Sequence, residues 1–136
     1  MGAALGAMVG WMTYGKRKFD AQDATMRRLI PSLHEGMKAL LPLIHRDTRA
    51  FDAYLAAVGM PKDTREQKAL RHAAMQRGLE AAVRVPLEVM RTADRCWEAM
   101  AEMAGHANPA SRSDLEVGAK ALEAGIWGAF RNVAIN

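Results

Sequence analysis

The sequence has one cysteine, few aromatic residues and no apolar run long enough to cross a bilayer. Cys96 cannot form an internal disulfide, and a single thiol cannot supply the paired cysteines of a zinc or iron–sulfur site. This cysteine content favours a reducing, intracellular compartment. Aromatic residues make up 6% of the chain and apolar residues 50%, with ten Met, a composition that favours closely packed helices over strands.

Only residues 1–12 could serve as a membrane or export segment, because they are nearly all apolar. Spanning a bilayer takes about 20 such residues. A secretory signal carries its cations before the apolar stretch, whereas Lys16, Arg17 and Lys18 follow it. Gly6 stands where a myristoylation signal needs Ser or Thr. We therefore expect no transmembrane segment, export or lipidation.

Blocks of like charge are also missing. The net charge of +4 comes from 19 Lys and Arg residues spread along the whole chain. This balance suits an anionic ligand without requiring one. Domains that bind nucleic acid usually have a denser basic stripe with exposed aromatics, but the three Trp here lie in apolar helical contexts. We expect no nucleic-acid partner.

Apolar spacing predicts one all-α domain, a helical bundle of about four long helices. The expected helices span about residues 2–14, 22–58 and 64–104, and a fourth begins at 113. Thr64 and Ser113 each open a capping-box pattern. Pro42 and Pro86 are expected to kink the second and third helices, because proline removes a backbone donor and clashes with the preceding turn. Glycines four apart in the first helix and repeated in the fourth predict that these two helices are close neighbours.

Asp47 is the most informative polar residue because it lies on an apolar seam. The seam of the second helix advances in alternating steps of four and three residues, and Asp47 falls between Ile44 and Phe51. A carboxylate there is expected to be partly desolvated, which makes it a candidate proton-transfer group. Pairing with an Arg, or capping a turn near Pro42, explains it equally well. The full predicted seam is Met26, Ile30, Leu33, Met37, Leu40, Ile44, Asp47, Phe51, Tyr54 and Val58.

Other candidate groups are weaker. His45, Asp47 and Asp52 scatter around their helix, so we expect no metal site there. Cys96 lies in an apolar context and is expected to be a core residue. The segment 108–114 gathers amide, guanidinium, hydroxyl and carboxylate groups at a helix start, where anions bind readily, although simple capping also explains its serine and aspartate.

Six strings along the chain resemble successive landmarks of the cyclodeaminase/cyclohydrolase family, in the family's order and spacing. Tyr14-Gly15-Lys16-Arg17 and Met26–Pro31 look specifically like the animal bifunctional formimidoyltransferase-cyclodeaminases. The chain thus resembles a partial cyclodeaminase domain, one domain over residues 1–136, with no formimidoyltransferase domain. The strings are Gly6–Lys16, Met26–Pro31, Met60–Thr64, Val85–Leu87, Ser111–Leu115 and Gly128–Asn136.

The resemblance implies conversion of 5-formimidoyltetrahydrofolate to 5,10-methenyltetrahydrofolate and ammonia, in histidine catabolism and one-carbon metabolism. It implies no cofactor beyond the tetrahydrofolate substrate, which can carry a polyglutamate tail. Implied partners are tetrahydrofolate derivatives and further copies of the chain, in a homo-oligomer built from dimers. A cytoplasmic location, with possible Golgi or centrosome association, is implied by likeness to the animal enzymes.

The family's catalytic aspartate falls on Asp47, the residue that the seam also singles out. No metal ligands are implied. Six further residues fall on family landmarks near the implied pocket, and we expect them to bind substrate or shape the pocket: Lys62, Arg112, Ser113, Asp114, Asn132 and Asn136.

The sequence departs from the family pattern in three places. The Gly-rich stretch before the family's first helix and the closing helical region after Asn136 are absent, and His45 stands where relatives tend to carry an acidic residue. We therefore expect a chain truncated at both ends. The alternative to an active cyclodeaminase is an inactive truncated helical module that retains folding or dimerisation, and ammonia release separates the two.

Overall fold

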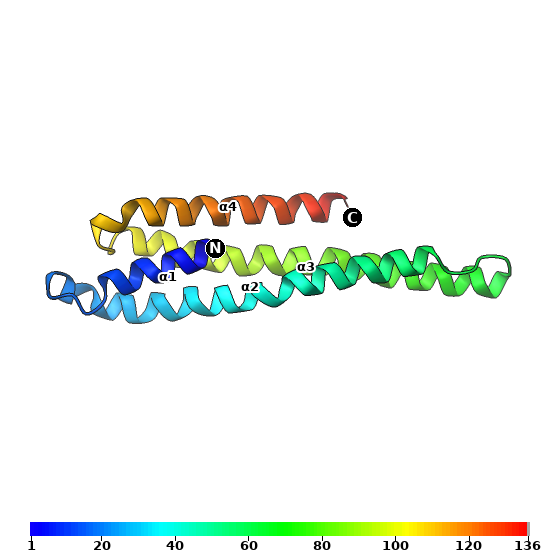
Figure 1. Cartoon of the computed structure of the whole chain (residues 1–136), viewed down its shortest axis with the longest axis horizontal. Helices are drawn as coiled ribbons and strands as arrows, with labels where there is room; N and C mark the ends of the chain where they lie inside the picture. The colour runs from blue at the N-terminus through cyan, green and yellow to red at the C-terminus, as the bar shows by residue number, and fades with distance from the viewer. Residues whose placement is uncertain (136) are drawn as a thin grey trace.

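The computed structural model describes residues 1–135 and is built from helices, with no strand in that range. Helices α2 and α3 form a long antiparallel pair, and α1 and α4 cover only one half of it (Figure 1). The predicted all-α bundle of four helices is confirmed. The elements are α1 (Gly2–Thr13), the 3₁₀ turn η1 (Arg17–Gln22), α2 (Asp23–Val58), α3 (Arg65–Ala104), the 3₁₀ turn η2 (Pro109–Ser111) and α4 (Arg112–Ile135).

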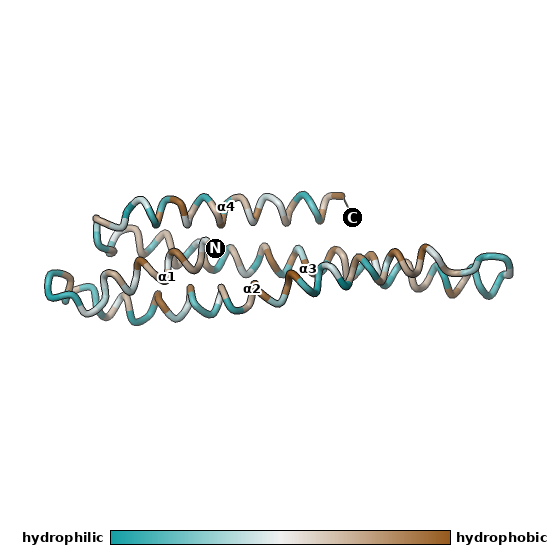
Figure 2. The backbone as a smooth tube through the Cα atoms, viewed as in Figure 1, coloured by the Kyte–Doolittle hydropathy of each residue, from teal (hydrophilic) through white to brown (hydrophobic). Residues whose placement is uncertain are grey.

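The two halves of the molecule differ in thickness. We call the half that contains α1 and α4 the proximal half, and the α2–α3 pair that extends beyond them the distal half (Figure 1). Hydrophilic residues concentrate in the connections at both ends of the molecule (Figure 2). The main core lies in the proximal half, where buried residues of all four helices meet: Ala3, Ala7, Val9, Met26, Leu29, Ile30, Leu33, Ala93, Cys96, Ala99, Met100, Met103, Leu115 and Leu122.

Capping explains where α3 begins, and it corrects the expected start of α4. The Thr64 hydroxyl accepts a hydrogen bond from the Gln67 N–H at 3.1 Å, and the Gln67 side chain accepts one from the Thr64 N–H, so this capping box is confirmed. The capping box expected at Ser113 is wrong. The chain already turns at η2, where the Asn108 side chain accepts from the Ala110 N–H, and α4 follows from Arg112.

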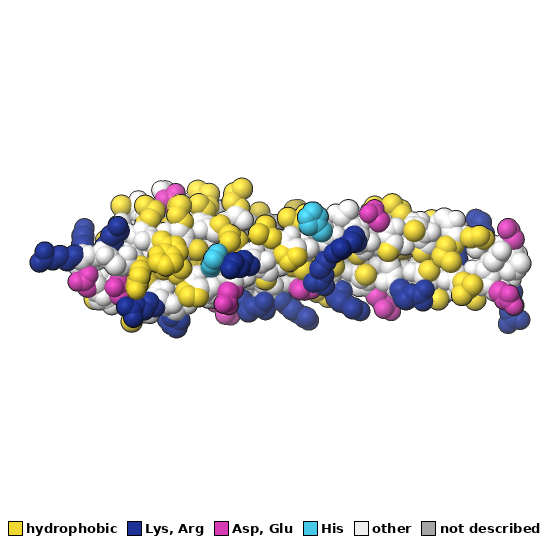
Figure 3. Space-filling model, turned by 60° about the horizontal axis from the view of Figure 1, so that its bottom comes forward, with side chains coloured by type: hydrophobic (Ala, Val, Ile, Leu, Met, Phe, Trp, Pro, Cys, Tyr) yellow, Lys and Arg dark blue, Asp and Glu magenta, His cyan; other side chains and the backbone are white. Residues whose placement is uncertain are grey.

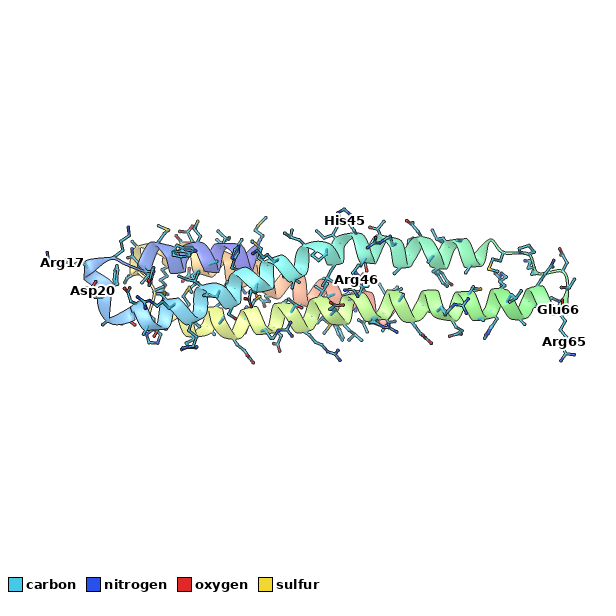
Figure 4. All side chains as sticks on the ribbon, turned by 90° about the horizontal axis from the view of Figure 1, so that it is seen from below. Arg17, Asp20, His45, Arg46, Arg65 and Glu66 are labelled. Carbon is cyan, nitrogen blue, oxygen red and sulfur yellow. The ribbon has the colours of Figure 1, made fainter. Side chains whose placement is uncertain are left out.

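The prolines leave their helices unbroken. Helix α2 runs continuously through Pro31 and Pro42, and α3 runs continuously through Pro86. Helix α2 changes course midway along its length, just before the labelled His45 (Figure 4).

Glycines let the helices approach closely at several contacts. A Cβ added at Gly2 would lie 2.4 Å from the Gly118 carbonyl oxygen, so α1 and α4 are neighbours as expected. In the distal half, a Cβ at Gly78 would lie 2.8 Å from the Tyr54 Cα, which presses α3 directly against the backbone of α2. Gly125 faces open space, with no atom within 4 Å of its added Cβ.

The buried face of α2 is displaced from the predicted seam after Pro42. Met26, Ile30 and Leu33 are buried as predicted, but beyond the proline the buried residues are Leu43, Ala50 and Ala57, seven apart. Ile44 and Phe51, which the seam placed inside, are exposed. The register moves by one residue because α3 packs against the alanines, which allow closer contact than the larger side chains do.

We expect Gly78→Ala to lower the free energy of unfolding by about 1–3 kcal/mol, because the new methyl group would meet the α2 backbone, which cannot rotate away. The matched change Gly125→Ala adds a methyl group in open space and should raise stability by about 0.5–1 kcal/mol through helix propensity. Urea unfolding followed by circular dichroism measures both variants. Equal effects of the two changes would contradict the packing described here.

The Arg28–Glu102 ion pair should make stability depend on pH. Arg28 donates two hydrogen bonds to the Glu102 carboxylate, one at 2.9 Å, and these bonds hold the pKa of that carboxyl below its ordinary value. The contribution is therefore complete above about pH 4.3 and is lost as the pH falls through the lowered folded-state pKa. We expect the stability difference between the parent and Glu102→Gln to shrink in that range. A difference that stays constant with pH would contradict this.

Candidate functional site

A groove of about 600 Å³ opens beyond the end of α1, between α2, α3 and α4. We call it the central groove. Residues 37–48 of α2, Pro86 to Ala93 of α3 and residues 121–132 of α4 line its walls, and Met1 to Ala3 close one end.

The groove is mainly apolar, and its polar side chains are few. Among its lining residues these are Asp47 and Thr48 from α2 and Asn132 from α4. Two of the predicted site residues, Asp47 and Asn132, are thus brought to one groove although 85 positions separate them in the sequence. An apolar hollow with a few polar groups is the usual form of a small-molecule site, and its volume lies within the usual range of about 300–1,000 Å³.

Asp47 is exposed, which corrects the expectation that it is partly desolvated. The displaced register of α2 turns it away from α3. It makes no hydrogen bond or ion pair within residues 1–135, so the alternative in which an arginine pairs with it is also not seen. Arg46 instead points toward α3 (Figure 4) and binds Glu88 at 2.9 Å. The Asp47 carboxylate is therefore free to meet a ligand.

Thr48 is a groove residue that the sequence did not single out. Its side chain is exposed, and its hydroxyl donates to the Ile44 carbonyl oxygen at 3.2 Å, which orients the hydroxyl beside Asp47. The sequence signal that could have identified it is the spacing of residues 41, 44 and 48, which all line the groove.

Lys62 lies far from the central groove. It is exposed in the connection between α2 and α3, at the end of the molecule where Arg65 and Glu66 are labelled (Figure 4). The eleven residues from Asp47 to the end of α2 alone span about 17 Å of helix axis. Lys62 therefore cannot touch a group held against Asp47 within one chain.

Arg112, Ser113 and Asp114 lie at the opposite end of α4 from Asn132. Arg112 lines a second hollow of about 540 Å³, at the turn between α3 and α4, and its guanidinium binds Glu116 at 2.8 Å. Twenty residues of helix separate Arg112 from Asn132, which is about 30 Å along the axis. These three residues do not share the groove of Asp47. Asn136 lies outside the described residues.

The remaining side chains considered as a nucleophile or as metal ligands do not form a further site in residues 1–135. Cys96 is fully buried, and burial raises the pKa of its thiol, so it lacks the thiolate character of a nucleophile. In residues 1–135 no three His, Cys, Asp or Glu side chains gather closely enough to hold a metal ion. In the same range, no helix has the length and apolar character needed to cross a membrane.

The chain is similar in sequence to proteins named for folate chemistry. Residues 1–136 match the family model described as formiminotransferase-cyclodeaminase. The chain is 55% identical over 136 residues to a formimidoyltransferase-cyclodeaminase of Sus scrofa and covers 25% of that protein. It is 35% identical to a methenyltetrahydrofolate cyclohydrolase of Methylorubrum extorquens and covers 65% of it. In both comparisons the whole of this chain is aligned.

A solved structure shares the fold. The formiminotetrahydrofolate cyclodeaminase of Thermotoga maritima superposes with a TM-score of 0.83 and 24% identity, over 99% of this chain and 63% of that one. The chain thus spans a quarter of the length of its animal relative and less than two thirds of the solved cyclodeaminase. Since the family model matches every residue, from the first glycines of α1 to the end of α4, the chain belongs to the formiminotransferase-cyclodeaminase family.

Proposed function

We propose that the central groove binds a tetrahydrofolate and that Asp47 transfers protons as 5-formimidoyltetrahydrofolate cyclises to 5,10-methenyltetrahydrofolate and ammonia. The observation that supports this most directly is the meeting of Asp47 and Asn132, from α2 and α4, on one apolar groove. Family membership and relatives named for cyclodeaminase and cyclohydrolase activity support the same substrate class.

The reaction needs a group that first accepts and then donates a proton. Folate N10 attacks the formimidoyl carbon, and a carbon–nitrogen bond forms while N10 loses its proton. The former imine nitrogen must gain two protons before the bond to carbon breaks and it leaves as ammonia. The Asp47 carboxylate can take the N10 proton and deliver it to that nitrogen, and solvent supplies the second. The positive charge of the methenyl product balances the added proton.

The side chains that line the central groove suit the binding and the orientation of a folate. Its apolar walls can pack against the fused rings of the folate, whereas Asn132 and Thr48 offer an amide and a hydroxyl that can fix the orientation of ring nitrogens. The exposed position of Asp47 leaves a path by which ammonia can escape. Asp47 and Asn132 thus form the proposed reacting site. Arg112 lines the other hollow, and Ser113 and Asp114 follow it at the start of α4.

We propose that Lys62 binds a different part of the substrate from the part that Asp47 contacts. It lies along α2 from the groove, on the side that a long anionic substituent would reach if it ran toward the distal end of the molecule. A polyglutamate tail is such a substituent, and basic side chains attract it over several ångströms. We therefore place Lys62 with the tail and not with the folate rings.

Further features of the proposal follow from the resemblance to the animal enzymes. They are a role in histidine catabolism and one-carbon metabolism, a homo-oligomer, and a cytoplasmic location with Golgi or centrosome association. No tetrahydrofolate cofactor other than the substrate is needed for the proton transfers described above.

Asp47→Asn should lower the rate of methenyltetrahydrofolate formation by about 100-fold to 10,000-fold, because the amide cannot carry the proton. Absorbance of the methenyl product and release of ammonia report the rate. Since Asp47 is exposed and unpaired, the variant should unfold at the same temperature as the parent. Glu35→Gln, an exposed acid elsewhere on α2, is the matched control and should keep full activity. Equal rates for Asp47→Asn and the parent would remove Asp47 from the mechanism, and a folded but inactive parent would favour the inactive helical module.

Lys62→Ala should raise KM for a polyglutamylated substrate by about threefold to fivefold and leave kcat unchanged, since an exposed ion pair contributes at most about 1 kcal/mol. KM for the monoglutamate should not change, because that substrate has no long tail to reach Lys62. Lys120→Ala, which removes another exposed lysine, is the control. An equal rise in KM for both substrates would contradict the assignment of Lys62 to the tail.

A further inference from the structure

A shallow hollow of about 470 Å³ lies between α3 and α4, on the opposite side of α4 from the central groove. We call it the aromatic hollow. Its volume lies within the usual range of small-molecule sites, about 300–1,000 Å³. Neither Asp47 nor Asn132 lines it, so the proposed function does not use it. Its lining residues are Met90, Asp94 and Trp97 of α3 and Glu123, Ile126, Trp127 and Phe130 of α4.

Three exposed aromatic rings distinguish this hollow from the rest of the surface. Trp97 is 37% exposed, Phe130 51% and Trp127 66%. Within residues 1–135 these rings do not stack on one another, unlike the rings of Trp11 and Tyr14 on the other side of the bundle's core. The space between the rings of the two helices is therefore open to a group that contacts more than one of them.

The charged groups in the lining are both carboxylates, although the chain has a net charge of +4. Lys and Arg side chains are spread over the face drawn in Figure 3, but none of the described ones lines this hollow. Glu123 is paired with Lys120 at 2.6 Å, whereas Asp94 makes no hydrogen bond or ion pair within residues 1–135. Asp94 thus leaves an uncompensated negative charge beside the three rings.

A cation already lies near one of these rings. The Arg131 guanidinium is 6.0 Å from the centroid of the Trp127 ring, at the outer limit for attraction between a cation and a π system. Arg131 is not among the lining residues, so its contact leaves the hollow itself open. The surroundings of the Trp127 ring therefore accept a positive charge.

The lining also selects the kind of cation. A metal ion or an ammonium group with N–H donors needs several oxygen acceptors around it. In the described lining only Asp94 and Glu123 carry side-chain oxygens, and both are exposed. A fully alkylated ammonium has no N–H to satisfy, and it is attracted both by the faces of aromatic rings and by a nearby carboxylate.

We propose that the aromatic hollow binds a small organic molecule that carries a quaternary ammonium group. The ammonium group lies among Trp97, Trp127 and Phe130, and Asp94 attracts its charge from the edge of the hollow. This site is separate from the central groove, and its ligand does not depend on whether a folate binds there.

The indole N–H signals of the three tryptophans report on this site in an NMR titration of the full chain with choline. Trp97 and Trp127 line the hollow, whereas Trp11 lies on α1 and is an internal control. We expect the first two signals to shift with one dissociation constant on the order of 1–10 mM, and the third not to move. An absence of shifts, or equal shifts of all three signals, would overturn the proposal.

The role of charge is tested with the carbon analogue of choline, in which a neutral tert-butyl group replaces the trimethylammonium group. This alcohol should bind at least about fivefold more weakly than choline, because only the cation is attracted by the rings and by Asp94. Asp94→Asn should weaken choline binding about threefold and reduce its dependence on salt. Asp52→Asn, at an exposed aspartate of α2, is the matched control and should change nothing. Equal affinities for the two compounds would overturn the assignment to a cation.

The role of the rings is tested with Trp127→Leu, which keeps an apolar side chain but removes the π system. Choline binding, followed through the Trp97 signal, should weaken about tenfold. Trp11→Leu removes another exposed tryptophan and should leave the affinity unchanged. Both positions are at least 60% exposed, so circular dichroism should show the same helical fold in both variants. A folded Trp127→Leu variant that binds choline as tightly as the parent would overturn the proposal.

Discussion

The close approach of α2 and α3 sets the shape of the whole molecule. Gly78 brings α3 against the backbone of α2 in the distal half, and a Cβ at Gly36 would lie 2.2 Å from the buried Cys96 sulfur in the proximal half. With Ala50 between these points and Ala57 just beyond the Gly78 contact, the shared face has little room for large side chains. Apart from the buried Leu43, the large apolar residues of α2 are directed elsewhere, into the proximal core before Pro42 and to the outside after it.

The central groove depends on this pairing and on the position of α4. Long helices α2 and α3 supply two walls, α4 supplies the third, and Met1 to Ala3 lie at one end. The same geometry leaves Asp47 exposed on a wall that is otherwise mostly apolar. A carboxylate at the margin of an apolar hollow can accept a proton from a bound ring system without being enclosed, which suits the proposed reaction, in which ammonia must leave.

Much of the fold could be predicted from the sequence because its signals are local. The Thr64 capping box, the Gly59–Asp63 break and the Gly105–Pro109 break fix helix ends through contacts within a few residues. The register of α2 after Pro42 could not be predicted, because two heptad patterns overlap there and periodicity favours the one with larger side chains. Helix packing selected Ala50 and Ala57 instead. Of the residues predicted for the site, Asp47 and Asn132 line one groove because the fold brings α2 and α4 together, whereas Lys62 and Arg112 lie at opposite ends of the molecule. Their separation along long helices could not be read from the sequence, and the roles of all of them stay predictions.

The distal half is only two helices thick, and this has a consequence for how the molecule opens. A residue of α2 or α3 in the proximal half has neighbours on several sides, whereas one in the distal half has a single partner helix, held partly by the Gly78 contact. Cooperative opening units follow the density of buried apolar contacts. The distal hairpin therefore forms a separate, less protected unit whose backbone amides exchange with solvent before the proximal core opens. Anything bound along the outer surface of α2 would couple the two units and make them unfold as one.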